Sequence, residues 1–251
     1  MKRTKLLLCV LLLILCAVFA AVSAGAADLK DAEAKAQSLK SLGLFRGVSD
    51  TDFDLNREPT RVEALVMLIR TLGKESEAQN GSWSHPFVDV PSWADPYVGY
   101  AYQNGLTKGV SAAEFGTGNA SAAMYVTFML RALGYSESDG DFTWDSPFDL
   151  AKKCGILPDG VDLNRFLRAD VAEISYSALS AKLKGSADTL SDRLVSAGVF
   201  TSDKLKSALS AVVGQDSGTS PRSKLPEIFI LPVQPKEPSL PASADGPAID
   251  D

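Results

Sequence analysis

A pattern that recurs about three times along this chain constrains its fold more than any other feature. In each copy, a helix predicted from apolar spacing stops at a Gly-hydrophobic pair, a short polar loop follows, and an apolar helix comes next. The three pairs are Gly43-Leu44, Gly105-Leu106 and Gly155-Ile156. Each unit must bury its apolar face against its neighbours, so the repetition predicts a binding scaffold with several similar faces.

The first two copies match at one constant offset, which relates Gly43, Gly47 and Phe53 to Gly105, Gly109 and Phe115. A single-residue deletion then aligns Leu72-Gly73 with Leu133-Gly134. The third copy is more divergent. Its last helix begins near Leu167-Arg168-Ala169-Asp170.

We therefore expect an all-α fold of three pseudo-repeat helical units with short loops. The predicted units are a partial first repeat at 27–79, a second at 80–138 and a divergent third at 139–185, closed by a helical half-repeat at 186–213. Seven of the 13 prolines lie in residues 214–251, which predicts an extended or disordered tail.

Local signals place the helix boundaries. We expect helices over residues 28–44 and 168–183, and a polar linker over 74–84. Thr60 is a natural N-cap, and Glu63 completes a capping box with it. The cap of the helix that ends at Leu133 is either Asn119 or Ser121.

The N-terminus has the features of a secretory signal peptide over residues 1–26. Lys2, Arg3 and Lys5 precede the apolar stretch Leu6–Ala21, and small residues follow up to a cleavage site before Ala27. An uncleaved membrane anchor is the alternative. After cleavage no remaining stretch is apolar enough to span a membrane, so we expect a secreted protein.

Charge and cysteine content exclude several classes of function. Signal removal changes the formal net charge from −6 to about −9, and an acidic protein is a poor partner for nucleic acid. It also leaves one cysteine, Cys154, and the chain has one histidine, His85. No disulfide can form within the chain, and a zinc site is nearly ruled out. We expect no metal and no cofactor.

Several motifs together carry a resemblance to a known family. They are Phe87-Val88-Asp89-Val90, Trp93-Ala94 and Gly105-Leu106 in the second unit, Thr60-Arg61-Val62-Glu63 in the first, and Leu167-Arg168-Ala169-Asp170 in the third. Over residues 28–184 the chain resembles the S-layer homology (SLH) domain family of bacterial cell-surface proteins. The resemblance implies a helical three-repeat assembly that binds secondary cell-wall polysaccharide non-covalently and holds a protein on the envelope.

The same resemblance implies that Asp, Trp and Arg of these motifs surround polymer-binding grooves. The candidate polymer-binding residues are Arg61, Glu63, Asp89, Trp93 and Arg168. A guanidinium makes planar, two-bond contacts with carboxylate or phosphate, and an indole can cover a sugar face.

Each candidate also has a purely structural interpretation. Arg61 and Arg168 can pair with a neighbouring acidic residue at a helix start, and Trp93, Tyr97 and Tyr100 can belong to the core.

We expect a protein of the cell wall or cell surface that attaches there through secondary cell-wall polysaccharide or another envelope glycan. The alternative is a protein–protein or self-assembly module of the surface layer, with surface-layer proteins as partners. Ala122 in place of the first unit's Arg61 favours that alternative. We do not expect an enzyme, because His85 lies in a loop with no nucleophile motif around it.

Overall fold

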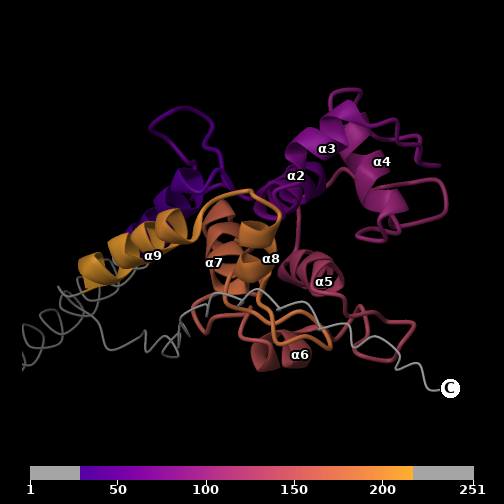
Figure 1. Ribbon diagram of the computed structural model, residues 1–251. Coiled ribbons are helices and arrows are strands. Elements are labelled where there is room, and N and C mark those ends of the chain that lie inside the picture. Colours follow the sequence, from indigo (N-terminus) through magenta and orange to yellow (C-terminus); the bar gives the residue numbers. More distant parts are fainter. Residues whose placement is uncertain (1–28, 217–251) are drawn as a thin grey trace, which may run out of the picture. The chain divides into compact units, whose positions relative to one another are not determined.

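The structure is a computed structural model in which residues 29–216 are described (Figure 1). Within this range it contains helices and three isolated β-bridges but no strand, which confirms the expected all-α fold. The predicted signal peptide, residues 1–26, and most of the predicted tail lie outside the described residues.

The helices follow the predicted order. Their bounds are 29–41 for the first helical segment, then α2 (Arg61–Thr71), α3 (Glu75–Asn80), α4 (Asp95–Gln103), α5 (Ala122–Ala132), α6 (Phe148–Lys153), α7 (Arg168–Ala178), α8 (Leu190–Ser196) and α9 (Ser202–Asp216).

The core is built around α2, α5 and α7, which contact one another pairwise. Each of these helices is 11 residues long, and most of their side chains are buried. The other helices pack around them: α4 lies against α2, and α6 lies against α5 (Figure 1). Each repeat thus contributes its apolar helix to one shared interior, because a helix that is apolar on most sides is stable only when surrounded.

All three units end a helix with the same turn. Gly43, Gly105 and Gly155 have φ angles of +81°, +71° and +73°, a region that favours glycine. The next residue in each case donates its N–H to the carbonyl five positions back, at 2.9, 2.8 and 3.0 Å. Gly198 repeats this geometry, with φ +72° and a bond from Val199 N–H to Leu194 O of 3.0 Å. The closing half-repeat therefore contains the same helix end.

The predicted caps of the central helices are present. Thr60 Oγ1 accepts the Glu63 N–H at 3.2 Å, and Glu63 Oε2 accepts the Thr60 N–H at 2.8 Å, which completes the capping box. Of the two caps considered for α5, Ser121 is correct, because its Oγ accepts the Met124 N–H at 3.2 Å.

Three boundaries differ from the prediction. The expected linker at 74–84 contains α3, which the buried Ala78 fixes to the core. The helix expected over 168–183 stops at Ala178, because the chain turns back and Ala181 O accepts the Leu190 N–H at 2.9 Å. Conversely, α9 continues to Asp216, past the expected start of the tail at 214. In the first two cases contacts with other segments override the local pattern.

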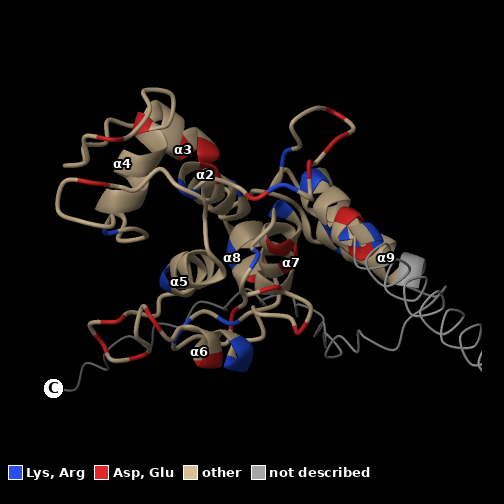
Figure 2. Ribbon diagram, turned by 180° about the vertical axis from the view of Figure 1, so that it is seen from behind, with Lys and Arg blue, Asp and Glu red and all other residues tan. Residues whose placement is uncertain are grey.

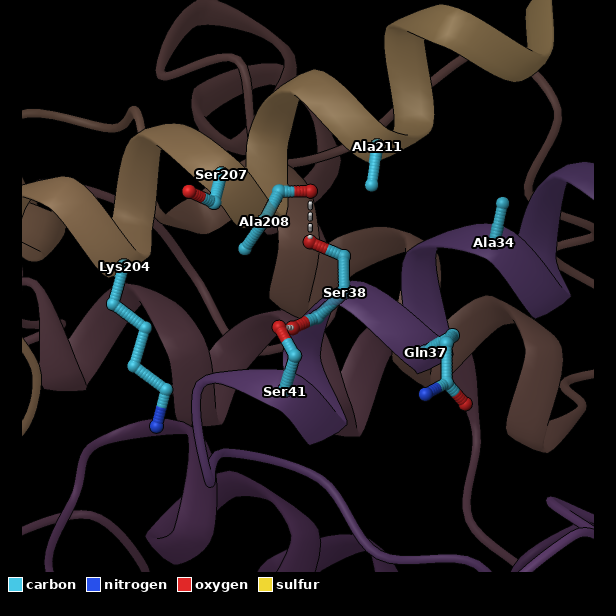
Figure 3. A pocket seen from close by; sticks show the side chains of 8 residues that line it. All are labelled: Ala34, Gln37, Ser38, Ser41, Lys204, Ser207, Ala208 and Ala211. Atoms are coloured by element: carbon cyan, nitrogen blue, oxygen red, sulfur yellow. Dashed lines mark hydrogen bonds between the residues drawn. The ribbon is translucent and has the colours of Figure 1, made fainter.

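The first helical segment packs against α9 in the opposite direction. Ala211 of α9 lies toward Ala34, and Lys204 lies toward Ser41 (Figure 3). Ser38 Oγ donates to Ala208 O at 2.8 Å between them. Small side chains line the shallow hollow of about 300 Å³ that separates the two helices. Because alanine and serine dominate the contact, the two backbones approach closely here.

One ion pair joins the same segment to α7, and a second lies within the segment. Lys35 Nζ lies 2.6 Å from Glu173 Oε2 and 2.7 Å from Asp31 Oδ2. Burial raises the pKa of Glu173, against the opposing charge of Lys35. On the same helix, burial raises the pKa of Asp170 to about 6, although its carboxylate accepts the Leu167 N–H at 2.7 Å. The fold therefore holds protons on these two carboxyl groups more tightly than an unfolded chain does.

We expect the free energy of unfolding to increase as the pH falls from about 7 to about 5, because a raised carboxyl pKa favours the folded state on protonation. Below about pH 4.5 the trend reverses, since Glu63 and Glu137 have pKa values near 2 in the fold and lose that stabilisation as they protonate. Urea unfolding across this range measures the effect. Asp170→Asn keeps an acceptor for the Leu167 N–H and should flatten the slope between pH 7 and 5; an unchanged slope contradicts the assignment.

Candidate functional site

Two of the three central helices begin with arginine and the other begins with alanine. Arg61 opens α2, Ala122 opens α5 and Arg168 opens α7. Arg61 and Arg168 each contact another unit, whereas the side chain of Ala122 is short and buried. Their surroundings are not equivalent.

Arg61 reaches from the first unit into the second. Its guanidinium carbon lies 5.0 Å from the centre of the Phe115 ring and 5.2 Å from the centre of the Phe128 ring. Its backbone N–H donates to Gly118 O at 2.8 Å. Two aromatic rings and this backbone bond therefore hold the cation at the junction of units one and two.

The charge of Arg61 is only partly compensated. Its Nε is buried and has no hydrogen-bond partner among the described residues. Burial, together with the nearby charge of Arg131, lowers the pKa of Arg61 to about 10, against the opposing effect of Asp89. The side chain remains a cation at neutral pH. It forms no ion pair shorter than 4 Å with any acidic group in residues 29–213.

Asp89 positions the loop that carries Phe115. Its two carboxylate oxygens accept the N–H groups of Phe115 at 2.7 Å and Gly116 at 2.8 Å. Burial acts to raise the pKa of Asp89, but these two donors and the charge of Arg61 outweigh it and keep the pKa below its ordinary value. Val88 N–H also donates to Ala113 O at 2.9 Å. The Phe87–Val90 segment therefore fixes the ring on which Arg61 rests.

Trp93 lies on the surface just before α4, with 57% of its area exposed. Tyr97 and Tyr100 of α4 are buried, so the core interpretation is right for them and wrong for Trp93. The reason is local. Trp93 lies in a turn that is closed by a hydrogen bond of 2.8 Å from the Ala94 N–H to Pro91 O. Because α4 begins only at Asp95, the helical spacing that suggested burial does not extend back to Trp93. Trp144, in the corresponding turn before α6, is 63% exposed.

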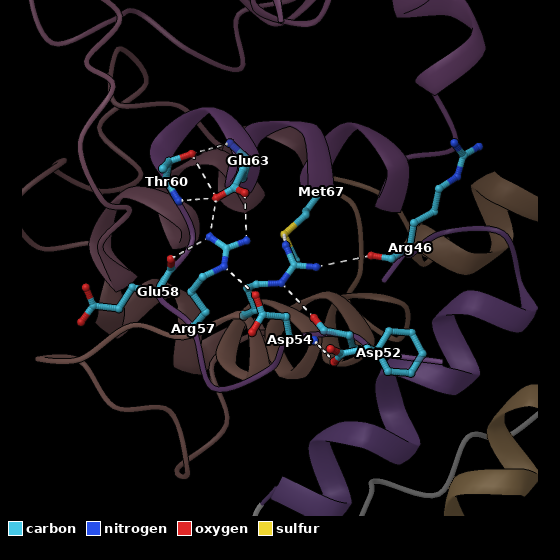
Figure 4. Close-up of polar contacts among 10 residues, drawn as sticks. Arg46, Asp52, Asp54, Arg57, Glu58, Thr60, Glu63 and Met67 are labelled. Carbon is cyan, nitrogen blue, oxygen red and sulfur yellow. Dashed lines mark hydrogen bonds and ion pairs between the residues drawn. The ribbon is translucent and has the colours of Figure 1, made fainter. Parts of the chain in front are cut away.

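The carboxylate of Glu63 is already hydrogen-bonded within the fold, at the start of α2. Besides its capping role, it accepts two bonds of 2.9 Å from the Arg57 guanidinium (Figure 4). Those bonds are the main cause that lowers the pKa of Glu63 to about 2. The carboxylate is thus held as an acceptor for Arg57 and Thr60.

The guanidinium of Arg168 is also hydrogen-bonded within the fold, at the junction of units three and one. It is only 5% exposed, and its Nε donates to Phe53 O at 2.9 Å. Its backbone N–H donates to Arg57 O at 2.9 Å. Burial lowers its pKa. The acidic pairing considered for Arg61 and Arg168 is absent from the described residues, since one stacks on aromatic rings and the other binds carbonyl groups.

Arg61 and Asp89 therefore act on each other electrostatically, whereas Glu63 and Arg168 are bound to other groups of the fold. Two contributors were not predicted from the sequence, Phe128 and Arg131, because both look like ordinary members of an apolar helix. For Phe128 the signal was the replacement of Met67 of the first repeat by an aromatic residue.

Basic and acidic positions are both spread along the described part of the chain and are not gathered in one segment (Figure 2). Within residues 29–216 no helix combines the length and hydrophobicity needed to cross a membrane. The same residues contain no group of three or more His, Cys, Asp or Glu side chains arranged for a metal ion.

Comparison with known proteins places the chain among bacterial surface proteins. A cell surface protein of Thermoanaerobacter kivui is 33% identical over 135 residues, 49% of this chain and 18% of that protein. A surface layer protein of Brevibacillus choshinensis is 32% identical over 125 residues, 48% and 11% of the two chains. The chain is related to proteins of the bacterial cell envelope.

A middle cell wall protein of Brevibacillus brevis is 31% identical over 111 residues, 43% of this chain and 10% of that protein. The matched region thus spans between about a tenth and a fifth of these relatives. No family model matches the chain. The relatives' names agree with the predicted cell-wall or cell-surface location.

Proposed function

We propose that this chain attaches a secreted protein to the bacterial envelope without a covalent bond, by binding an anionic secondary cell-wall polysaccharide as SLH domains do. The proposal includes no catalytic step. His85 Nδ1 accepts the Phe87 N–H at 3.1 Å and Nε2 lies 3.1 Å from Asp95 Oδ1, so both ring nitrogens are engaged.

The observation that carries this proposal is the environment of Arg61. The guanidinium of Arg61 lies over the Phe115 and Phe128 rings, and its Nε has no hydrogen-bond partner within the described range, so its positive charge is available to an anion. The one carboxylate that acts on it, Asp89, already accepts two backbone N–H groups. A carboxylate or phosphate group on a sugar supplies the missing charge through bidentate contacts.

One such contact is worth only about 1.5–3 kcal/mol, which is weak for lasting retention. A polymer with repeated negative groups offsets this weakness, because a released group is replaced by a neighbour at high local concentration. A wall polysaccharide therefore suits this site better than a free sugar does.

Sedimentation with wall sacculi tests the proposal. The mature chain should pellet with sacculi that retain their secondary polymer and stay in solution when that polymer has been extracted. Arg61→Met should remain in solution in both cases. Lys206→Met removes an equal charge from the exposed face of α9 and should pellet like the wild type. Equal pelleting with extracted sacculi would rule out the polymer as the ligand.

Trp93→Ala should weaken polymer binding by about three- to tenfold with little effect on stability, because an exposed indole contributes a flat apolar surface rather than core packing. Trp144→Ala is a matched control, since Trp144 is equally exposed but belongs to the third unit. Titration of each variant with released wall polymer gives the affinities. Equal losses in both variants would argue against a site confined to the junction of units one and two.

A second candidate function is assembly of the surface layer through protein contacts. It is favoured by the exposed apolar residues of the second unit, where Val88 is 82% exposed and Val110 is 60% exposed. Light scattering of the mature chain without any polysaccharide separates the two. Concentration-dependent growth in mass supports assembly, and a constant monomer mass supports attachment.

A further inference from the structure

A second pair of cations lies close to Arg61. Arg131, near the end of α5, donates from Nε to Glu137 Oε2 at 3.0 Å and from Nη1 to Leu106 O at 3.1 Å. Lys108 follows two residues after Leu106, and its Nζ lies 3.6 Å from Glu137 Oε1. The Arg131 bonds are the main cause that lowers the pKa of Glu137 to about 2. Arg131 thus neutralises Glu137, which leaves Lys108 only loosely paired.

The first unit repeats this arrangement at the corresponding positions. Arg70 Nε and Arg46 Nη2 lie 2.9 Å from the two oxygens of Glu75. Arg46 and Lys108 are alike in exposure, each with 64% of the side chain open to solvent. The two units therefore present the same pair of cations around one carboxylate.

The two arrangements differ in the arginine that enters from the neighbouring unit. In the second unit this residue is Arg61, whose Nε has no hydrogen-bond partner in the part of the chain that the structure describes. In the first unit it is Arg168, which is buried and donates to Phe53 O and, at 3.5 Å, to Arg46 O. Carbonyl groups of the chain thus bind the arginine at the junction of units three and one, whereas no group among the described residues accepts a hydrogen bond from Arg61 Nε at the junction of units one and two.

The junction of units one and two also carries further positive charges next to Arg61. Phe128, on which Arg61 stacks, lies three residues before Arg131 on α5, so the two side chains occupy neighbouring positions on one face of the helix. Arg131 binds the carbonyl of Leu106, which places Lys108 next along the loop. Arg131 acts electrostatically on Arg61, and Arg131 and Lys108 share the carboxylate of Glu137, so the three cations belong to one cluster.

We propose that Lys108 is a second anion contact of this junction, so that the ligand is a polymer with negative groups at more than one position along its length. This inference rests on the proposed function and specifies how the ligand is held. Arg61 binds one negative group end-on, and Lys108 leaves its long ion pair with Glu137 to bind another. Arg46, the counterpart of Lys108 in the first unit, does not contribute to ligand binding, because the arginine at its junction, Arg168, is already bound to carbonyl groups of the chain.

Titration of the mature chain with three defined polymers tests the inference. Polygalacturonate carries carboxylates, poly(glycerol phosphate) carries phosphates, and dextran is neutral. We expect binding to one or both polyanions and none to dextran. Lys108→Gln should weaken that binding by about two- to fivefold, because a contact made by a solvent-exposed lysine is weaker than a buried one, and should reduce its sensitivity to salt. Arg46→Gln should leave both quantities unchanged.

Each outcome bears on one of the two proposals. Wild-type protein that binds neither polyanion, or binds dextran equally well, contradicts the charge-based attachment itself. Binding that Arg61→Met abolishes but Lys108→Gln leaves unchanged keeps the attachment function and overturns the second contact. Equal losses in Lys108→Gln and Arg46→Gln also overturn it, because they show a general effect of charge. The preferred polyanion identifies the chemistry of the negative group.

Discussion

Gly109→Ala is expected to destabilise the fold by about 3 kcal/mol, while Gly105→Ala, four residues earlier, costs about 1 kcal/mol. Both glycines have positive φ angles, +75° and +71°, so both substitutions carry the same backbone penalty. The difference lies in the surroundings. A Cβ on Gly109 meets Phe87 Cε1 at 2.4 Å and Glu114 O at 2.6 Å, whereas a Cβ on Gly105 meets nothing within 4 Å.

Urea unfolding of both variants, followed by circular dichroism, measures this difference. The Gly109 variant should also bind polymer less well, because Phe87 packs against Phe115 with ring centres 5.9 Å apart, and Phe115 supports Arg61. Equal destabilisation by the two substitutions would mean that the loop moves aside freely, which contradicts the tight packing of Phe87 described here.

Arg168→Met and Arg61→Met should have opposite consequences. Arg168→Met should lower the free energy of unfolding by about 2–4 kcal/mol, because Phe53 O loses its donor in a buried position. Arg61→Met should change it by about 1 kcal/mol or less, because the buried Nε of Arg61 gives up no hydrogen bond and a methionine still packs between two rings.

Polymer binding should show the reverse order. Arg168→Met, measured well below its unfolding midpoint, should still pellet with wall sacculi, whereas Arg61→Met should not. Denaturation curves and sedimentation on the same preparations check both halves. A stable Arg168→Met that has lost binding, together with an unstable Arg61→Met that retains it, would reverse the roles assigned to the two arginines.

Much of the fold could be predicted from the sequence because its signals are local. Glycine at each helix end requires a left-handed turn, and Thr60 with Glu63 fixes the start of α2. The predictions that were wrong concern segments whose structure depends on contacts with other parts of the chain. The end of α7 follows from pairing with Leu190, and α3 forms in a polar segment because Ala78 finds a place in the core.

The site was only partly predictable for the same reason. Arg61 and Arg168 begin equivalent helices within similar motifs, yet one stacks on the rings of the second unit and the other bonds to a carbonyl 115 residues away. No local pattern distinguishes them. Trp93 was misjudged as a core candidate because its spacing to Tyr97 resembles that of a helix that has not yet begun.

The pairwise contact of α2, α5 and α7 has a consequence for how the molecule gains and loses its structure. In an open stack of repeats, an end unit can melt while the rest persists. Here every unit borders both others, so removing any one exposes apolar surface on the two that remain. The chain should therefore melt in one cooperative step, and neither a single repeat nor a pair of them is a self-sufficient folding unit.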